Sequence, residues 1–271
     1  MQDNYSHYYP FFDAELNFDP VPSVRWMKAN WTSSIWISVS YLFFVYSIQI
    51  IMRRRKALEL NGLLFLWNAS LSMFSFLGFT RMTPEFFYVL SRKNFHHSIC
   101  KTTYAVGVTG FWTQLFAFSK ALELLDTAFI VLRKRPVIFL HVYHHVTVLV
   151  YTWHAYQIRS ASGRWFVWMN FLVHSIMYAY FAVRSLGYRT PKNLSVAITT
   201  LQLTQMVVGC FIALASYNAL NADSSCQQTF ENLYFSFFIY FTYFILFARY
   251  FHDAYLVAKP TIKFGPEKKM N

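Results

Sequence analysis

Residues 137–155 read VIFLHVYHHVTVLVYTWHA, a run that is apolar enough to cross a membrane and yet contains a cluster of histidines. Ionisable side chains at membrane depth are expensive, so they usually face a protein interior or a cavity and serve a function. On a helix, His141, His144 and His145 stand at i, i+3 and i+4 and form one patch about one turn long. The run therefore predicts both a membrane-spanning helix and a functional site.

The rest of the chain has the composition of an integral membrane protein. Its 271 residues are 56% hydrophobic and only 13% charged, which is more apolar than an average soluble domain. Residues 1–20 have neither the cationic start nor the apolar run of a cleavable signal peptide. We expect an all-α membrane protein forming a single polytopic domain over residues 1–271. Seven segments have the length and apolarity of membrane-spanning helices: residues 31–52, 58–79, 104–132, 137–155, 165–183, 194–215 and 230–248.

The distribution of Lys and Arg predicts the orientation, because cytosolic loops of membrane proteins carry an excess of these residues. With a lumenal N-terminus and a cytosolic C-terminus, fifteen of the 24 Lys and Arg residues fall on the cytosolic side and eight on the other, while Lys120 lies within a span. We therefore expect residues 1–30 to be a lumenal segment and residues 257–271 a cytosolic basic tail. This placement accounts for the net charge of +12, and no nucleic-acid partner is expected.

Three short signals depend on that orientation. Asn4 begins a sequon on the lumenal side and is a predicted glycosylation site. Cys100 and Cys226 both lie on the oxidising lumenal face, where we expect a disulfide, with two unrelated free thiols as the alternative. Lys268 and Lys269 resemble a dilysine retrieval signal, which would place the chain in the endoplasmic reticulum membrane; a solvated basic tail is the alternative.

Polar residues recur at helical spacing in three further spans, at about the depth of the histidines. Four helices would then place polar stripes together in the cytosolic half of the membrane. The alternative for each stripe is a set of hydrogen bonds that only hold helices together. The stripes are Lys120, Glu123, Asp126 and Thr127 in the third span; Asn170, His174 and Tyr178 in the fifth; and Thr199, Gln202 and Gln205 in the sixth.

Two chemistries suit the histidine cluster. The first is a metal site, as in membrane desaturases and hydroxylases, which contain HxxHH boxes but need several of them. Only His141, His144, His145 and His174 share one depth here, although four ligands would suffice for a single zinc ion. The second is acyl transfer, in which a neutral imidazole acts as nucleophile or base. A lipid transporter that binds without catalysis is a third possibility.

Four motifs in order resemble the ELO family of fatty-acid elongases over about residues 58–255. Phe181 departs from the pattern, since many members have a tyrosine there. The segments 120–151 and 163–180 most resemble the branch that acts on saturated and monounsaturated chains. The motifs are Lys120-x-x-Glu123-x-x-Asp126-Thr127, His141-x-x-His144-His145, Asn170-x-x-x-His174-x-x-Met177-Tyr178-x-Tyr180 and Thr199-x-x-Gln202-x-x-Gln205.

The resemblance implies a 3-oxoacyl-CoA synthase that condenses a long-chain acyl-CoA with malonyl-CoA and releases CoA and CO2. It implies seven helices, with the second to seventh ringed around a substrate tunnel that is closed at the lumenal end. No metal, flavin or nicotinamide cofactor is expected. The product would pass to three further enzymes, a 3-ketoacyl-CoA reductase, a 3-hydroxyacyl-CoA dehydratase and an enoyl-CoA reductase.

The same resemblance implies roles for individual residues. His144 would attack the acyl thioester, and His174 would contact the bound 3-oxoacyl group or move protons. The predicted supporting catalytic residues are His141, His145 and Asp126. The predicted substrate-binding residues are Lys120, Glu123, Asn170, Tyr178, Gln202 and Gln205, together with Arg133, Lys134 and Arg135, whose charges would bind the CoA phosphates.

Overall fold

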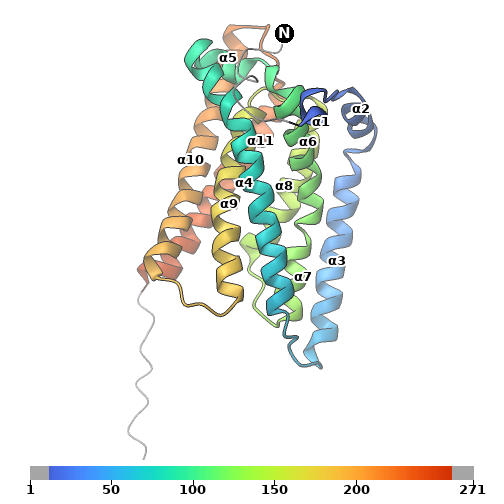
Figure 1. The fold of residues 1–271 in the computed structure, drawn as a ribbon, viewed down its shortest axis with the longest axis vertical. Helices are drawn as coiled ribbons and strands as arrows, with labels where there is room; N and C mark the ends of the chain where they lie inside the picture. Colours follow the sequence, from blue (N-terminus) through green and yellow to red (C-terminus); the bar gives the residue numbers. More distant parts are fainter. Residues whose placement is uncertain (1–11, 258–271) are drawn as a thin grey trace, which may run out of the picture.

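The computed structural model describes residues 12–257, and within them the chain is helical with no strand (Figure 1). The elements are α1 (Asp13–Leu16), α2 (Val21–Asn30), α3 (Ser33–Arg53), α4 (Asn61–Arg92), α5 (Phe95–Cys100), η2 (Thr103–Ala105), α6 (Gly107–Leu122), α7 (Leu125–Leu132), α8 (Phe139–Gln157), α9 (Gly163–Ser185), α10 (Lys192–Ala222), α11 (Phe230–Phe251) and η3 (His252–Leu256). The predicted sites Asn4, Lys268 and Lys269 lie outside the described residues.

Five of these helices are long and apolar enough to cross a membrane: α3, α4, α9, α10 and the segment Phe230–Leu256. Large apolar side chains cover their outer surfaces. Trp36 and Phe43, two turns apart on α3, are 72% and 73% exposed. Contiguous exposed apolar surface on this scale is not stable in water and suits contact with lipid. The expected all-α membrane architecture is therefore confirmed at this level.

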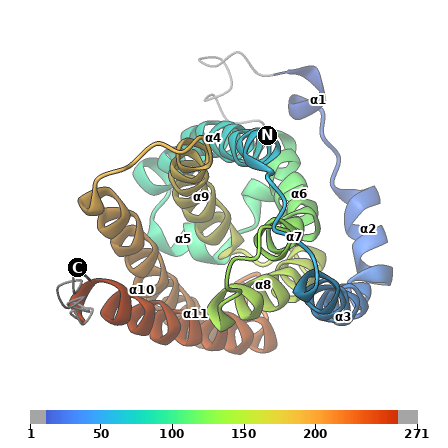
Figure 2. The same cartoon turned by 90° about the horizontal axis from the view of Figure 1, so that it is seen from below.

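The long helices are arranged in a ring around a common interior (Figure 2). Around the ring, α4 packs on α6, α6 on α8, α8 on α11, α11 on α10, α10 on α9, and α9 again on α4. Small residues allow the closest approaches, since a β-carbon at Gly78 of α4 would stand 2.5 Å from the Phe171 ring of α9. Helix α3 lies outside the ring, against α7 and α8.

The third predicted span is not one continuous helix. It is divided into α6, which ends at Leu122, and α7, which begins at Leu125. At the break the backbone tightens to i→i+3 hydrogen bonds, from the Asp126 amide to the Glu123 carbonyl and from the Thr127 amide to the Leu124 carbonyl. The expected single span over residues 104–132 is therefore two helices, although Lys120 and Asp126 on either side of the break both hydrogen-bond residues of α9.

Several predicted helix boundaries also shift. Helix α8 begins at Phe139, two residues later than expected, because Ile138 is extended with φ −86° and ψ 149°. The histidine box consequently occupies the first turns of α8. Helix α4 continues to Arg92, well past the expected end at residue 79. The segment 1–30, expected only as a lumenal extension, contains the helices α1 and α2 among its described residues.

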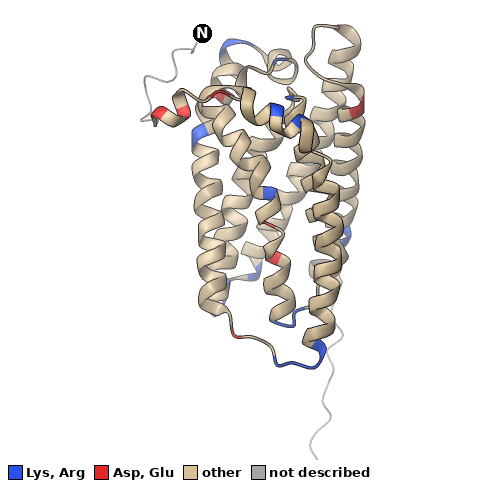
Figure 3. Cartoon of the chain, turned by 90° about the vertical axis from the view of Figure 1, so that its right-hand side faces the viewer, with Lys and Arg blue, Asp and Glu red and all other residues tan. Residues whose placement is uncertain are grey.

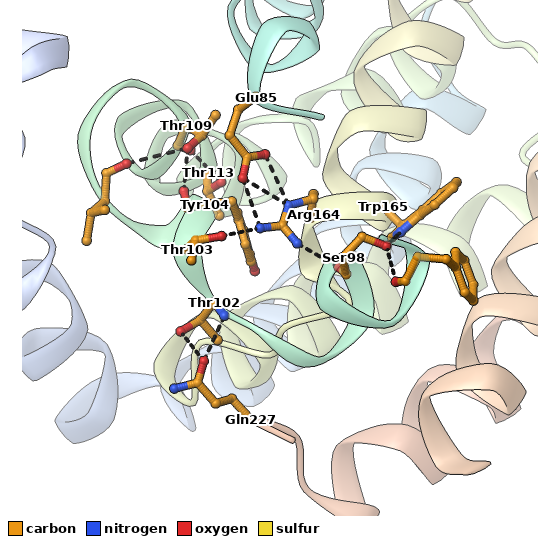
Figure 4. A network of polar contacts seen from close by, with 12 residues as sticks. Glu85, Ser98, Thr102, Thr103, Tyr104, Thr109, Thr113, Arg164, Trp165 and Gln227 are labelled. Carbon is orange, nitrogen blue, oxygen red and sulfur yellow. Dashed lines mark hydrogen bonds and ion pairs between the residues drawn. The ribbon is translucent and has the colours of Figure 1, made fainter. Parts of the chain in front are cut away.

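A buried charged network joins the helix ends on the side of the ring where α5 and η2 lie (Figure 4). Arg164, with no exposed surface, forms an ion pair with Glu85 of α4 at 2.9 Å. The same guanidinium donates to the Ser98 carbonyl at 2.7 Å and to the Thr103 hydroxyl at 2.6 Å. A disulfide joins Cys100 to Cys226 beside this network, the pairing expected from the sequence. Together these links close this end of the ring.

Positive charge gathers at the opposite end of the bundle (Figure 3). The connection α3–α4 carries Arg54, Arg55 and Lys56, and the connection α7–α8 carries residues 133–135. Between the two ends few positions are charged (Figure 3). Lys120 and Glu123 are buried, and Asp126 lies close to them in sequence at the start of α7. The fold therefore has one end held together by a buried ion pair and a disulfide, and two cationic connections at the other end.

Candidate active site

The three histidines of α8 have different surroundings. His141 hydrogen-bonds the Thr127 hydroxyl at 2.8 Å, and its ring centre lies 4.4 Å from that of His145. His145 is 5% exposed, and its Nε2 atom lies 3.9 Å from a carboxylate oxygen of Asp126. Within residues 12–257 the imidazole of His144 makes no hydrogen bond, and it packs against the Tyr243 ring at 5.0 Å. The His145 ring likewise makes no hydrogen bond in this part of the chain, since Asp126 is too far for one and its buried Nδ1 has no partner, but His144 is the less buried of the two.

Thr127 connects α8 to α3. Its hydroxyl, fully buried, lies 2.7 Å from the Tyr41 hydroxyl and 2.8 Å from His141 Nε2. A hydroxyl can donate one hydrogen bond and accept others, so a single Thr satisfies both partners. This contact fixes the His141 ring at the entrance turn of α8.

Replacing Thr127 with Val is expected to lower the free energy of unfolding by about 1–3 kcal/mol, because Tyr41 and His141 lose a hydrogen-bond partner in a buried setting. An SDS titration in mixed micelles measures this loss. Thr204→Val is the control, since the exposed Thr204 hydroxyl bonds only the Thr200 carbonyl one turn back; it should change stability by less than about 0.5 kcal/mol. Equal losses in the two variants would contradict the bridging role of Thr127.

Asp126 is held by two helices other than its own. The Trp67 indole of α4 donates to one carboxylate oxygen at 2.5 Å, and the Tyr178 hydroxyl of α9 donates to the other at 2.7 Å. Charge-assisted hydrogen bonds of this kind are short and strong. They fix the carboxylate beside His145, which it can orient or polarise. Asp126 stands in the first turn of α7, directly after the break.

A second buried network lies at the end of α6 and faces α9. Lys120 donates to Glu123 at 2.8 Å and to Asn170 at 3.1 Å. The Ser119 hydroxyl donates to the same Glu123 oxygen at 2.9 Å. The second Glu123 oxygen makes no hydrogen bond within the described chain and lies 3.9 Å from His174 Nδ1. Glu123 is thus neutralised on one side and directed toward His174 on the other.

His144 and His174 belong to helices that are not neighbours in the ring, so they face its interior from different sides. Asp126 joins the two sides, because it accepts a hydrogen bond from Tyr178 of α9 and lies 3.9 Å from His145 of α8. The structure therefore brings three of the four predicted stripes into one site. The fourth stripe, on α10, is turned elsewhere: Gln202 contacts the Met177 sulfur at 3.3 Å and Thr199 the Tyr255 hydroxyl at 3.2 Å.

The remaining predicted residues lie at the edges of the site. Gln205 is buried beside Tyr240 of α11. Of the basic connection after α7, Arg133 donates to Asn61 at 2.9 Å and Lys134 to the Arg53 carbonyl at 3.5 Å. These cations therefore stand at the mouth of the ring, away from the histidines.

A cavity begins one helical turn from the histidines and continues toward the end of the ring where Arg164 and the disulfide lie. Val148, four residues after His144, and Asn170, four residues before His174, both line it. At the other end it reaches Tyr156 and Gly163, about 16–18 Å along the helices from the two histidines. Its walls are mostly apolar and aromatic. The site thus consists of a polar reaction centre with a deep apolar pocket behind it.

Two contributing residues were not predicted from the sequence. Trp67 holds Asp126, and Tyr243 covers His144 and donates to its backbone carbonyl at 3.2 Å. Neither has a sequence signal, since each is one aromatic residue in an apolar helix of a chain with 30 Phe, 19 Tyr and 8 Trp residues.

The arrangement suits nucleophilic and acid–base chemistry by imidazole. The His141 ring is hydrogen-bonded to Thr127, the His145 and His174 rings each lie 3.9 Å from a carboxylate oxygen, and the His144 ring packs against Tyr243. Within residues 12–257 no set of three or more His, Cys, Asp and Glu side chains is positioned as a metal-binding group.

Comparisons with known proteins agree with these features. The model of the ELO family, described as the GNS1/SUR4 family, matches residues 26–263. The chain is 52% identical over 256 residues to putative fatty acid elongase 3 of Caenorhabditis elegans, covering 94% of this chain and 79% of the relative. It is 43% identical to very long chain fatty acid elongase 6 of Drosophila melanogaster, covering 93% and 80%. It is 37% identical to the human protein of that name, covering 90% and 92%.

Proposed function

The chain belongs to the ELO family, and on this basis we propose that it is a fatty-acid elongase that condenses a long-chain acyl-CoA with malonyl-CoA. The products are a 3-oxoacyl-CoA, CoA and CO2. The observation that carries the proposal is the His144 imidazole, without hydrogen bonds within the described chain, one helical turn from the lining of an apolar cavity. A thioester carbonyl placed at His144 would have its acyl tail in that cavity.

The proposed reaction has two steps. A nitrogen of His144 attacks the thioester carbonyl, the C–S bond breaks, and CoA leaves as the thiol after taking up a proton. Malonyl-CoA then loses CO2, and the resulting enolate attacks the acyl-imidazole, forming the C–C bond and breaking the C–N bond. Covalent catalysis of this kind divides one difficult step into two easier ones.

The neighbouring residues support these steps. Asp126, fixed by Trp67 and Tyr178, orients and polarises His145 beside the nucleophile. His174, backed by Glu123, is placed to contact the bound 3-oxoacyl group or to move a proton.

A membrane topology follows from the same proposal. The ring helices and α3 give seven spans when α6 and α7 are taken as one broken span, with the N-terminus in the lumen of the endoplasmic reticulum and the C-terminus in the cytosol. The cations at residues 53–56 and 133–135 would then attract CoA phosphates at a cytosolic mouth. Gln202 and Gln205 of α10 are proposed to contact the thioester or the pantetheine arm.

The direct test is condensation by the purified wild-type protein. Incubation with a panel of acyl-CoA chains and radiolabelled malonyl-CoA should give labelled 3-oxoacyl-CoA, with saturated and monounsaturated chains preferred. A lipid transporter would bind acyl chains and consume no malonyl-CoA, and a desaturase would oxidise the chain without lengthening it. Absence of labelled product from every acyl-CoA in the panel would overturn the proposal. The product is a β-keto thioester, so reducing and dehydrating enzymes must act after this one.

A further inference from the structure

The cavity behind the histidines extends beyond the ring of helices. Two of its lining residues, Pro20 and Val24, belong to the start of α2, which lies outside the ring (Figure 2). The family segment matched by this chain begins only at residue 26, so both residues precede it. The far end of the cavity is therefore formed by a part of the chain that the family match does not include.

The lining of the cavity runs along α6 and α8 as far as α2. Gly110, Thr113 and Ala117 line it from α6 at i, i+3 and i+7. Val148, Thr152 and Ala155 line it from α8 at i, i+4 and i+7, and larger residues of both helices complete these walls. Small side chains at these positions leave space that larger ones would fill. Val24 contributes the lining from α2.

Helix α2 is held in place on both sides of Val24. The Ser23 hydroxyl lies 2.7 Å from the hydroxyl of Tyr156, itself a lining residue of α8. Val24 is 7% exposed and packs with Met27, Leu149 and Trp153. These contacts make α2 a fixed wall.

The preceding turn is fixed as well. Glu15 of α1 is buried, accepts a hydrogen bond from the Trp112 indole at 2.6 Å and forms an ion pair with Arg81 at 3.3 Å. Trp112 lies on α6 and Arg81 on α4, so the segment that leads into α2 is attached to two helices of the ring. The position of Pro20 and Val24 is thereby determined by long-range contacts.

We infer that the start of α2 is the stopper of the acyl cavity and that Val24 sets the longest chain the enzyme elongates. The inference rests on the proposed function, because it takes the occupant of the cavity to be an acyl chain. A terminal methyl group that reaches Val24 meets a rigid apolar wall. A chain that is longer by one two-carbon unit must displace this wall or leave its thioester short of His144.

The test compares substitutions of two valines on the same helix. Val24→Trp should lower kcat/KM for the longest acyl-CoA accepted by the wild type by about ten- to hundredfold, as expected for methylene-sized misfits in an apolar pocket. Much shorter acyl-CoA chains should react unchanged. Val24→Ala should shift acceptance toward longer chains. Val21→Trp is the matched control, since Val21 is 46% exposed and does not line the cavity.

Opposite shifts from the larger and the smaller residue at position 24, with none from Val21→Trp, would support the stopper, because general misfolding cannot lengthen the accepted chain. The same length profile in the wild type and both Val24 variants would overturn it. Thermal stabilisation by a ladder of acyl-CoA chains, without malonyl-CoA, separates this inference from the proposed function. If the wild type condenses nothing, the binding measurement still tests the stopper. Long acyl-CoA chains that stabilise the wild type but not Val24→Trp would support it. The same stabilisation by every chain length in the wild type and in Val24→Trp would overturn it.

Discussion

His144→Ala is expected to abolish the acyl adduct that forms when the wild-type enzyme meets acyl-CoA alone. Intact-mass spectrometry should show the wild type heavier by one acyl group and the variant unchanged. Condensation with malonyl-CoA should fall by about a thousandfold or more, as is usual when a covalent nucleophile is removed. The physical reason is that the His144 imidazole makes no hydrogen bond within the described chain, is less buried than that of His145, and lies one helical turn from Val148, which lines the cavity.

The control for this experiment is His154→Ala, a histidine of the same helix near its other end. His154 Nδ1 lies 3.1 Å from the Asn232 amide, far along α8 from the reaction centre. This variant should keep the adduct and most of the activity. An adduct that persists in His144→Ala, or one that maps to His174 in the wild type, would assign the nucleophile to another residue.

Arg164→Met is expected to lower the free energy of unfolding by about 3–5 kcal/mol, because it leaves the buried Glu85 carboxylate without its main cation. The Ser98 carbonyl and the Thr103 hydroxyl lose donors at the same time. An SDS titration in mixed micelles compares the variant with the wild type. Arg189→Met, at an exposed position, should change stability by less than about 0.5 kcal/mol.

A double variant separates two contributions to the free energy of unfolding, the destabilisation caused by an unpaired buried charge and the stabilisation given by the ion pair itself. When Glu85→Met is added to Arg164→Met, no isolated charge remains and most of the lost stability should return. If the double variant were as unstable as the single one, the network would act through packing or through its hydrogen bonds to Ser98 and Thr103. If Arg164→Met alone were neutral, the seal at this end of the ring would not depend on the ion pair.

Local patterns in the sequence predicted most of the helices. Apolar runs located α3, α9, α10 and α11 to within a few residues at most ends, because membrane-spanning helices must satisfy their own backbone hydrogen bonds over a set length. The charges in the third span hid its apolar pattern, but their helical spacing still indicated a helix there. The residues Lys120, Asp126, His141 and His174 were named for the site because ionisable groups are costly at such depth.

The same patterns could not predict where a helix breaks or which partner a polar group finds. The turn after Leu122 has no Pro or Gly to mark it. Beyond it Asp126 bonds Trp67 of α4 and Tyr178 of α9, and no sequence pattern pairs it with either. The α10 stripe looked equivalent to the others, and its hydrogen bonds run to Met177 and Tyr255 instead of to the histidines. Such pairings join residues far apart in the chain, and periodicity carries no information about them.

The sequence by itself determined the helical membrane architecture and the set of ionisable residues at one depth, since both follow from the cost of burying polar groups in an apolar phase. Only the tertiary structure decided which partner each of those residues contacts. A hydrogen bond between residues 59 positions apart fixes Asp126 to Trp67, and one between residues 133 positions apart fixes Ser23 to Tyr156. The ring brings these distant residues together, and their packing places Asp126 beside His145 and α2 against the cavity.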